Sequence, residues 1–420
     1  MYRKNLIKIV LICLIAMGNA GAVVRLTQQN GFGSRAFSLA NNYVSQSNDL
    51  SGLYWNPALM AFSPVVEFHV SVATGSFTGK SELYGFDTSS TMRGIRLPSA
   101  GLMFSLPSVR GGLTFALAYN NPVLFDDISV YKTNNNSSAY IQKMYRTSGG
   151  LNFWSGGFGL QVAPKTAVGL TISFISGKDE LKDQFYQSFE GIPVENYLSN
   201  VTGKYRGIDI RGGVAYKTDK FSAGARVTMP QVIVLNDEEL YTDSMLPKTF
   251  VYRSSVRMYS SYSGALGVSY AFPFFTITAE ARGTLPFDYR FPQEDIPDNS
   301  QAKFFKIGGG AGIEVPLVVK PLLFRAGYSY DEIDLHPYVM KFYDEDSKQN
   351  YFDWSDDRTR ADRNKHQVTA GIGLLSSSVS FDIGYGFATW KLIQKNATGK
   401  DALFQDYRQH KVAATLSLRY

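Results

Sequence analysis

Cysteine is almost missing from this 420-residue chain. The single cysteine, Cys13, lies in an apolar run near the N-terminus, and we expect it to be removed together with that run. The remaining chain would then have no disulfide, no thiolate chemistry and no cysteine-ligated metal. Apolar stretches of about 18 residues are also missing after this region, so no transmembrane helix is expected.

The sequence also lacks the short motifs of hydrolases, metalloproteases and nucleotide-binding proteins. No HExxH, CxxC, GxSxG or P-loop pattern occurs. His69 and His410 are expected on adjacent strands but at different heights, which argues against a catalytic Ser/His pair there. The acidic loop 331–362 has no EF-hand spacing. We therefore expect no enzyme activity, no cofactor and no metal site. The net charge falls from +6 to +3 once Arg3, Lys4 and Lys8 are removed, and this does not indicate nucleic-acid binding.

Residues 1–22 are interpreted as a secretory signal peptide. Arg3, Lys4 and Lys8 form the positively charged end, and an apolar run extends from there to Met17. Ala20-Gly21-Ala22 fits the small-x-small cleavage rule, with a cut after Ala20 as the second choice. A retained membrane anchor is the alternative, but its length and flanking residues fit poorly.

Glycine and aromatic residues are abundant in the rest of the chain. There are 38 Gly, 26 Tyr and 29 Phe, while the hydrophobic content is an ordinary 44%. A secreted chain of this composition without disulfides needs another source of stability. A transmembrane β-barrel supplies one, because every backbone group pairs with a neighbouring strand and aromatic rings lie at both membrane interfaces.

Segments of about 9 to 12 residues with alternating hydrophobicity recur along the chain, as expected for strands. Short and long links alternate between them, which is typical of bacterial barrels with an even strand number and both chain ends in the periplasm. The sequence therefore predicts an all-β fold: a transmembrane antiparallel barrel of about 14 strands over residues 65–420. The predicted strands are 65–74, 98–107, 111–120, 150–162, 166–177, 204–217, 220–230, 258–272, 274–286, 303–315, 321–331, 365–375, 378–390 and 409–420.

Alternation also assigns the two faces of each strand. The apolar face must contact lipid, because a charge at mid-bilayer on that face costs roughly 2–4 kcal/mol. The opposite face then carries charges of both signs into the lumen. Two interpretations are open: paired charges that hold a plug against the wall, or a charged track for a polar solute. The main inward charges are Glu67, Asp209, Arg211, Glu280, Arg282, Arg325 and Asp382, with His69, Arg226, Lys306, Glu314, Lys411 and Arg419.

Residues 23–64 precede the first strand and do not alternate. We expect a short helix over Ser34–Ser45 with a serine N-cap, and a turn at Asn56-Pro57. A barrel of this size encloses a lumen wider than its own side chains fill. A segment of about 40 residues placed in this lumen would close it, and its aromatic and leucine side chains would either line an apolar pocket or simply pack. Those side chains are Phe32, Phe37, Leu39, Tyr43, Leu53, Tyr54 and Trp55.

This segment resembles the FadL/TodX family of outer-membrane transporters for hydrophobic compounds. The resemblance is carried by Gly33-Ser34-Arg35-Ala36, by Asn48-Asp49 and above all by Asn56-Pro57-Ala58 just before the first strand. The family often has glycine after that turn, where this chain has Leu59. The resemblance implies that residues 23–64 fold into the lumen as a hatch, and that a ligand passes from the outer loops to a pocket and leaves sideways through the wall. The hatch or ligand-binding candidates are then Arg35, Phe37, Trp55, Asn56, Pro57 and Ala58.

The resulting hypothesis is passive uptake of long-chain fatty acids or aromatic hydrocarbons across the outer membrane of a Gram-negative bacterium. The expected partners are hydrophobic small molecules, outer-membrane lipids and lipopolysaccharide, and the barrel-assembly machinery, with the chain as a monomer. One alternative is a barrel of the same shape that serves as a structural or secretion-system subunit. Another is a simple porin for polar solutes.

Overall fold

A computed structural model describes most of the chain. It covers residues 28–29, 31–83, 86–106, 111–132, 139–243, 249–285, 306–317, 321–332, 339–344, 349–353, 359–395 and 401–420. The expected signal peptide 1–22 and its cleavage site lie outside these residues. None of the helices in the described ranges is long and apolar enough to cross a membrane.

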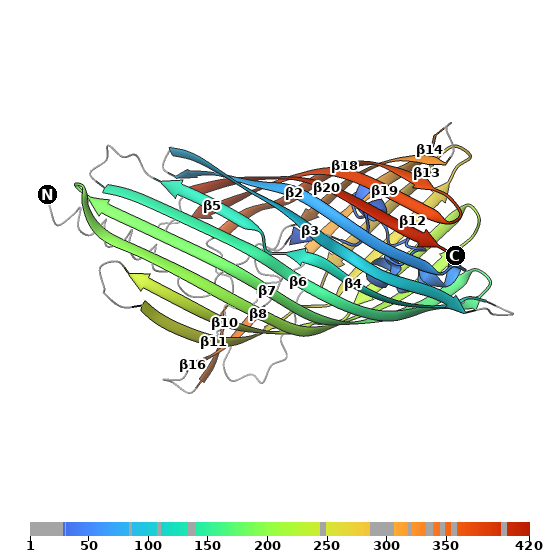
Figure 1. Cartoon of the computed structure of the whole chain (residues 1–420), viewed down its shortest axis with the longest axis horizontal. Coiled ribbons are helices and arrows are strands. Elements are labelled where there is room, and N and C mark those ends of the chain that lie inside the picture. The colour runs from blue at the N-terminus through green and yellow to red at the C-terminus, as the bar shows by residue number, and fades with distance from the viewer. Residues whose placement is uncertain are drawn as a thin grey trace.

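The structure is a closed antiparallel β-barrel (Figure 1). Each strand of the wall pairs antiparallel with its neighbours around the ring, and the last strand, β20, pairs with β19 and β2 to close it. The strands are β2 (Glu67–Leu83), β3 (Phe86–Leu106), β4 (Leu113–Leu124), β6 (Ala139–Ala163), β7 (Thr166–Phe189), β8 (Ile192–Lys217), β9 (Phe221–Thr228), β10 (Val232–Asp243), β11 (Thr249–Tyr259), β12 (Ser263–Ala271), β13 (Thr276–Thr284), β14 (Lys306–Pro316), β15 (Leu322–Glu332), β18 (Thr359–Leu375), β19 (Val379–Lys395) and β20 (Asp401–Arg419).

Two neighbouring strands of the wall are interrupted at the same height. β8 pairs with β9 along residues 211–217 and with β10 along residues 197–208. β9 and β10 therefore form one strand of the wall that is broken at 229–231. β12 and β11 pair with β9 and β10 in the same way across a break at 260–262. Counting β9 with β10 as one strand, and β11 with β12 as another, gives 14 strands, which confirms the predicted fold.

Several strands are much longer than the sequence predicted. The expected links 75–97, 178–203 and 231–257 are mostly paired hairpin, because β2–β3, β7–β8 and β10–β11 continue through them. The interpretation of these ranges as loops was therefore wrong. Above the apolar band neither face needs to be hydrophobic, so alternation disappears from the sequence while the backbone ladder continues. Part of the expected loop 332–364 also forms the hairpin strands β16 (Val339–Asp344) and β17 (Gln349–Asp353).

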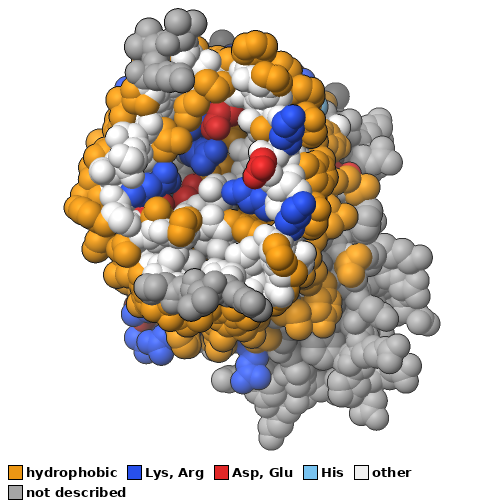
Figure 2. All heavy atoms as spheres, turned by 90° about the vertical axis from the view of Figure 1, so that its right-hand side faces the viewer, with side chains coloured by type: hydrophobic (Ala, Val, Ile, Leu, Met, Phe, Trp, Pro, Cys, Tyr) orange, Lys and Arg blue, Asp and Glu red, His pale blue; other side chains and the backbone are white. Residues whose placement is uncertain are grey.

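The two faces of the wall have opposite chemistry. Exposed apolar side chains such as Phe174, Leu266 and Phe381 cover the outside. Figure 2 looks at the end where the C-terminus lies: hydrophobic side chains surround the mouth, and charged side chains lie within the hollow. Glu67, Asp209, Arg211, Glu280, Arg325 and Asp382 are buried on the inner face.

The hatch lies inside the barrel towards the end that carries the C-terminus (Figure 1). It contains β1 (Gln28–Gln29), α2 (Ser34–Ser38), α3 (Gly52–Trp55) and a 3-10 helix, η1 (Pro57–Phe62). The first helix is shorter than the predicted Ser34–Ser45, and it begins after Gly33 without a side-chain cap. The expected serine cap was wrong because Ser34 is already helical, and its N–H and hydroxyl both hydrogen bond to Thr415 of the wall.

Candidate functional site: the hatch, the lumen cavity and the adjoining wall

The Asn56-Pro57-Ala58 turn fixes the hatch to the wall. Asn56 is fully buried in extended conformation between α3 and η1. Its side-chain N–H groups donate to the carbonyls of Val44 and Val214, both at 3.1 Å, and its side-chain oxygen accepts from the N–H of Ala58 at 3.2 Å. One amide thus ties together two parts of the hatch and strand β8, which explains why this residue type precedes the proline.

The wall has glycines where this turn approaches it. A Cβ atom at Gly213 of β8 would lie 2.1 Å from the side-chain oxygen of Asn56, and one at Gly169 of β7 would lie 2.4 Å from the backbone of Pro57. The hatch backbone therefore packs directly on the strand at Gly169, and the Asn56 side chain does so at Gly213, which leaves no room for a side chain at either position.

Arg35 connects α2 to a buried chain of charges. Its guanidinium forms two hydrogen bonds with the carboxylate of Glu314 on β14, at 3.2 and 3.3 Å. Glu314 also accepts from Arg325 of β15 at 2.5 Å, and Arg325 pairs in turn with Asp382 of β19. Arg325 is only 2% exposed, so these alternating charges compensate one another in the interior.

Glu280 and Arg282 of β13 hold the middle of the hatch. The Glu280 carboxylate accepts from the backbone N–H groups of Tyr43 and Val44 at 2.8 and 2.9 Å. Arg282 pairs with Asp331 at 2.6 Å and donates to the carbonyl of Asn41 at 3.4 Å. Inward carboxylates and guanidinium groups thus complete the hydrogen bonds of an irregular backbone segment that has few of its own.

Arg211 and Arg226 hold the end of α3. Both donate to the carbonyl of Tyr54, at 2.9 and 3.1 Å, and Arg211 stacks 4.0 Å from the centre of the Tyr54 ring. Arg211 also pairs with Asp209 at 2.6 Å. The Nε atom of Arg226 is buried and has no hydrogen-bond partner among the described residues.

The remaining predicted residues occupy the opposite side of the lumen. Glu67 pairs with Arg419 at 3.2 Å across the closing strands, and His69 contacts the ring of Phe32 edge-on. Phe37 packs against the wall, with the Lys411 ammonium 4.4 Å from its ring centre. His69 and His410 lie far apart on their strands, opposite Ser417 and Ser76 respectively, as expected.

Asp49 carries a buried charge inside the hatch itself. Burial alone would raise the pKa of this carboxyl, but the Arg35 charge and hydrogen bonds from Ser51 and Tyr43 outweigh it, so its pKa lies below the usual value. Asp49 accepts from the Tyr43 hydroxyl at 2.7 Å and from the Ser51 N–H at 3.0 Å. It therefore stays ionised near neutral pH and holds two turns of the hatch together.

A cavity of about 260 Å³ lies in the lumen beside the hatch. Its lining combines apolar, charged and uncharged polar residues. The larger apolar side chains are those of Tyr54, Trp55, Val123 and Phe153. The charged side chains are those of Arg211, Arg226, Arg282, Lys306 and Lys365, with Asp331 and Glu332.

Only two of the expected hatch aromatics reach this cavity. Tyr54 and Trp55 line it, whereas Phe32, Leu39, Tyr43 and Leu53 are fully buried in packing between hatch and wall. The apolar wall of the cavity instead uses Val123 of β4 and Phe153 of β6. Sequence reasoning missed Val123 because it lies outside the predicted strands. It missed Phe153 because this residue shares the inner face of β6 with the buried Leu151, so that face is not marked as polar by alternation.

The wall loosens beside the cavity between β3 and β4. The two strands pair only from Ser99 with Asn120 to Leu106 with Leu113, although β3 extends back to Phe86. At Asn120-Asn121-Pro122 the ladder of β4 with β6 also shifts register. Proline has no N–H to donate, so this is where a strand leaves its neighbour.

Beyond this break the chain turns inward and continues as β5 (Asp127–Lys132). β5 pairs with β6 on one side and packs on the inner face of β2, where a Cβ atom at Gly79 would lie 2.3 Å from the carbonyl of Ile128. Ser129 contacts Ser81 at 3.3 Å. An Arg96–Asp126 ion pair bridges β3 and the turn before β5.

β1 occupies part of the edge of β4 that β3 leaves free. Gln28 and Gln29 pair with Leu124 and Val123 of β4, while the other edge of β4 at these positions pairs with β6. Val123 also lines the lumen cavity. The N-terminal strand therefore lies between the cavity and the place where the wall loosens.

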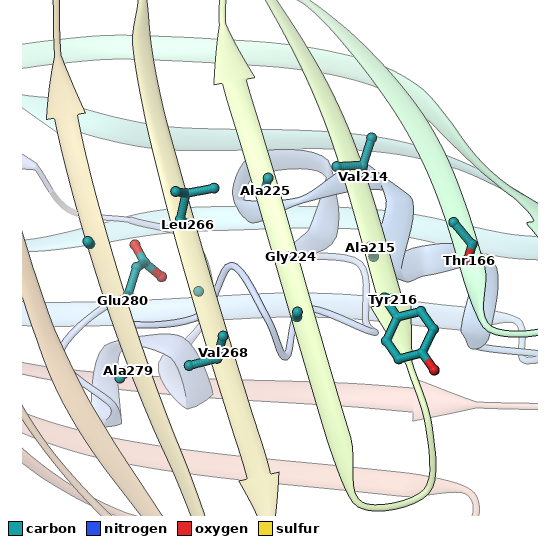
Figure 3. A pocket seen from close by; sticks show the side chains of 13 residues that line it. Thr166, Val214, Ala215, Tyr216, Gly224, Ala225, Leu266, Val268, Ala279 and Glu280 are labelled. Atoms are coloured by element: carbon teal, nitrogen blue, oxygen red, sulfur yellow. The ribbon is translucent and has the colours of Figure 1, made fainter.

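A second hollow, of about 770 Å³, lies on the outer face over β8, β9, β12 and β13 (Figure 3). Its floor has small residues such as Ala225 and Ala279, and Val214, Tyr216 and Leu266 border it. The ladders β8–β9, β9–β12 and β12–β13 are unbroken here. It is therefore a surface groove and no passage through the wall.

The described part of the chain brings no three His, Cys, Asp or Glu side chains together as a metal ion would require. Five of the ten acidic residues of the loop 331–362 lie outside the described residues.

The chain matches no protein-family model and no curated protein sequence. Among solved structures it is similar to the toluene transporter TodX of P. putida, with 14% identity and a TM-score of 0.62 over 94% of this chain and 99% of that one. A FadL homologue of Pseudomonas aeruginosa gives 14% identity and a TM-score of 0.62 over 95% and 99%. The toluene transporter TbuX of Ralstonia pickettii gives 10% and 0.59 over 94% and 99%. The chain thus has the fold of these barrels.

Proposed function

We propose that this chain is an outer-membrane channel for the passive uptake of hydrophobic small molecules. The shared fold with barrels described as toluene transporters and a FadL homologue supports this. The lumen is filled by a hatch that hydrogen bonds to strands around the ring, so a water-filled pore for polar solutes fits poorly. The outer apolar surface suits a lipid environment.

The observation that carries the proposal concerns Val123. This residue lines the lumen cavity and belongs to the short segment of β4 that no longer pairs with β3. The cavity therefore borders the one place in the described wall where a strand turns inward. A hydrophobic molecule that reaches the cavity has a short route sideways into the membrane, and this route passes β1, the N-terminal strand of the hatch.

The cavity favours amphipathic ligands that have an acidic group. Its aromatic residues suit a hydrocarbon, and its lining holds five cations and only two carboxylates. The free Nε of Arg226 supplies a buried donor for an anion. Among the two candidate classes, long-chain fatty acids fit this arrangement better than neutral aromatic hydrocarbons.

Uptake by a deletion strain tests the proposal. We expect slower uptake of long-chain fatty acids, restored by the wild-type chain but only in part by Arg226→Met. Arg253→Met, which removes an exposed outer cation, should restore uptake fully. Unchanged uptake of both fatty acids and aromatic hydrocarbons in the deletion strain would contradict the proposal. A stable complex with other envelope proteins would then support a structural or secretion role.

We infer further that the barrel works as a monomer in the outer membrane. β20 pairs along its length with both β19 and β2, so the described wall has no free edge at closure for a second copy. Folding of such a closed wall within a membrane requires the barrel-assembly machinery, which is the expected partner. Sedimentation in detergent tests the oligomeric state.

A further inference from the structure

A basic patch stands on the outer face of the wall, on the side of β7, β8, β10 and β11. It consists of Lys178, Lys204, Arg206 and Arg257, all exposed. Figure 2 shows basic side chains projecting beyond the apolar ring on the lower side, where Figure 1 places β8, β10 and β11. These cations face away from the hatch and the cavity, so the proposed transport does not use them.

The ladder registers show that the four cations form one compact patch. Lys178 lies directly opposite Lys204, and Arg206 follows two residues along β8 on the same face. Arg206 and Arg257 both lie opposite Val234 of β10, one from each side. With strands about 4.8 Å apart, the patch, which extends from β7 to β11 over three strand spacings, is about 14 Å wide.

The patch has far more positive than negative charge. Lys178 pairs with Glu180 at 2.6 Å, and both side chains are exposed. Lys204, Arg206 and Arg257 have no ion pair among the described residues. Like charges directly opposite each other on a strand pair destabilise a sheet. The repulsion between Lys178 and Lys204 therefore lowers the stability of this part of the wall, and a bound anion would offset it.

The depth of the patch in the membrane indicates which part of a lipid it contacts. Directly below it lies an exposed apolar row with an aromatic rim, formed by Trp154, Phe174, Ile208 and Val232. Arg206 lies ten residues along β8 from Tyr216, which contacts Phe221 beside the short turn at the other end. About 9 to 11 residues of a tilted strand cross a bilayer, so Arg206 stands at the depth of the headgroups.

We propose that this patch binds the phosphorylated headgroup of an outer-leaflet glycolipid while the row below packs against its acyl chains. The end with the long hairpins faces outward in a barrel of this type, which places the patch in the outer leaflet. A zwitterionic phospholipid has no net charge to offset four cations. A glycolipid with two phosphates supplies several acceptors across the width of the patch, and Arg and Lys are the side chains that bind phosphate. The proposal rests on the membrane placement and is independent of what the channel transports.

Binding of lipid A by the full mature chain in detergent tests the proposal. We expect bisphosphorylated lipid A to bind more tightly than the monophosphorylated form, and phosphatidylethanolamine to bind weakly. Lys204→Gln/Arg206→Gln should weaken binding of the bisphosphorylated lipid about 25-fold, since each interfacial cation contributes about fivefold. Added salt should weaken wild-type binding more than that of the variant.

Lys165→Gln/Lys220→Gln is the matched control. It removes two exposed cations at the short-turn end of the same strands, and lipid A binding should not change. Heat-modifiable gel mobility confirms that each variant folds. Equal binding by Lys204→Gln/Arg206→Gln and wild type would overturn the proposal, as would a loss confined to Lys165→Gln/Lys220→Gln. Fatty-acid uptake measured on the same variants separates this outcome from failure of the transport proposal.

Discussion

Arg35 and Glu314 form a two-bonded ion pair although 279 positions separate them in the sequence. The pair joins the first helix of the hatch to the inner face of β14. Glu314 is shared with Arg325, which pairs with Asp382. The hatch is thereby connected to three strands of the barrel through one line of charges, and this connection suggests direct tests.

Loss of Arg35 should loosen the hatch. Arg35→Gln leaves Glu314 with one cation in place of two, and we expect a cost of about 1–3 kcal/mol, below the range for fully buried pairs because both side chains are partly exposed. Ion conductance in planar bilayers should rise as the lumen opens. Arg253→Gln breaks an exposed pair with Glu238 and should leave conductance unchanged. A conductance of Arg35→Gln equal to that of wild type would show that the other hatch-to-wall contacts hold the hatch in place without Arg35.

The glycine opposite Asn56 should not tolerate a side chain. In Gly213→Ala the new Cβ would lie 2.1 Å from the side-chain oxygen of Asn56, so the turn must shift and lose hydrogen bonds, at about 1–3 kcal/mol. Hydrogen exchange should show loss of protection in residues 44–58 while the strands stay protected. Gly212→Ala is the neighbouring control, since nothing lies within 4 Å of its Cβ position. Equal protection in both variants would contradict the assigned contact.

Fixing β1 to β4 should block the proposed route. Gln29 and Val123 are opposite each other in an antiparallel ladder, where Cα atoms are about 4.5–5.5 Å apart, a separation that a disulfide spans. Cys13, the one natural cysteine, lies in the expected signal peptide. We expect oxidised Gln29→Cys/Val123→Cys to take up ligand severalfold more slowly and to recover on reduction.

The control for this cross-link is Asn236→Cys/Ser255→Cys. These two residues are paired and exposed on the outer face, away from the cavity. Oxidation there should leave uptake unchanged. If the oxidised Gln29→Cys/Val123→Cys protein also transports at full rate, β1 does not lie on the route.

Docking of β5 should depend on pH through Asp127. Burial raises the pKa of this carboxyl to about 7, despite hydrogen bonds from the Ile128 N–H and the Tyr407 hydroxyl. An unfolded aspartate titrates near pH 4, so the native state binds more protons between about pH 4 and 7 and its stability falls as pH rises through that window. Protection factors in 127–132 should be higher at pH 5.5 than at pH 8.5. In Asp127→Asn, which has no titrating group at this position, the protection factors should be the same at pH 5.5 and pH 8.5. If this variant shows the same pH dependence as wild type, Asp127 does not cause that dependence.

The barrel itself follows from the sequence. Period-two alternation and the regular exchange of short and long links predict the strand number, the direction of the wall and the inward position of charges such as Asp209 and Arg325. These features are local, because a strand in a membrane must alternate residue by residue. Where the strands leave the apolar band that constraint ends, and the predicted loops turned out to be paired hairpins.

The site depends on contacts that no local pattern records. The Asn56-Pro57 turn is visible in the sequence, but its attachment to Val214 and its fit against Gly213 arise only when η1 lies against β8. The partners of Arg35, the inward path of β5 and the presence of Val123 beside Tyr54 in one cavity likewise join residues that are distant in the chain. The sequence determines which side chains of each strand face the lipid and which face the lumen, because each residue is exposed to one of these two environments. Which inward residues meet the hatch is decided by closure of the barrel, because that alone fixes their distances.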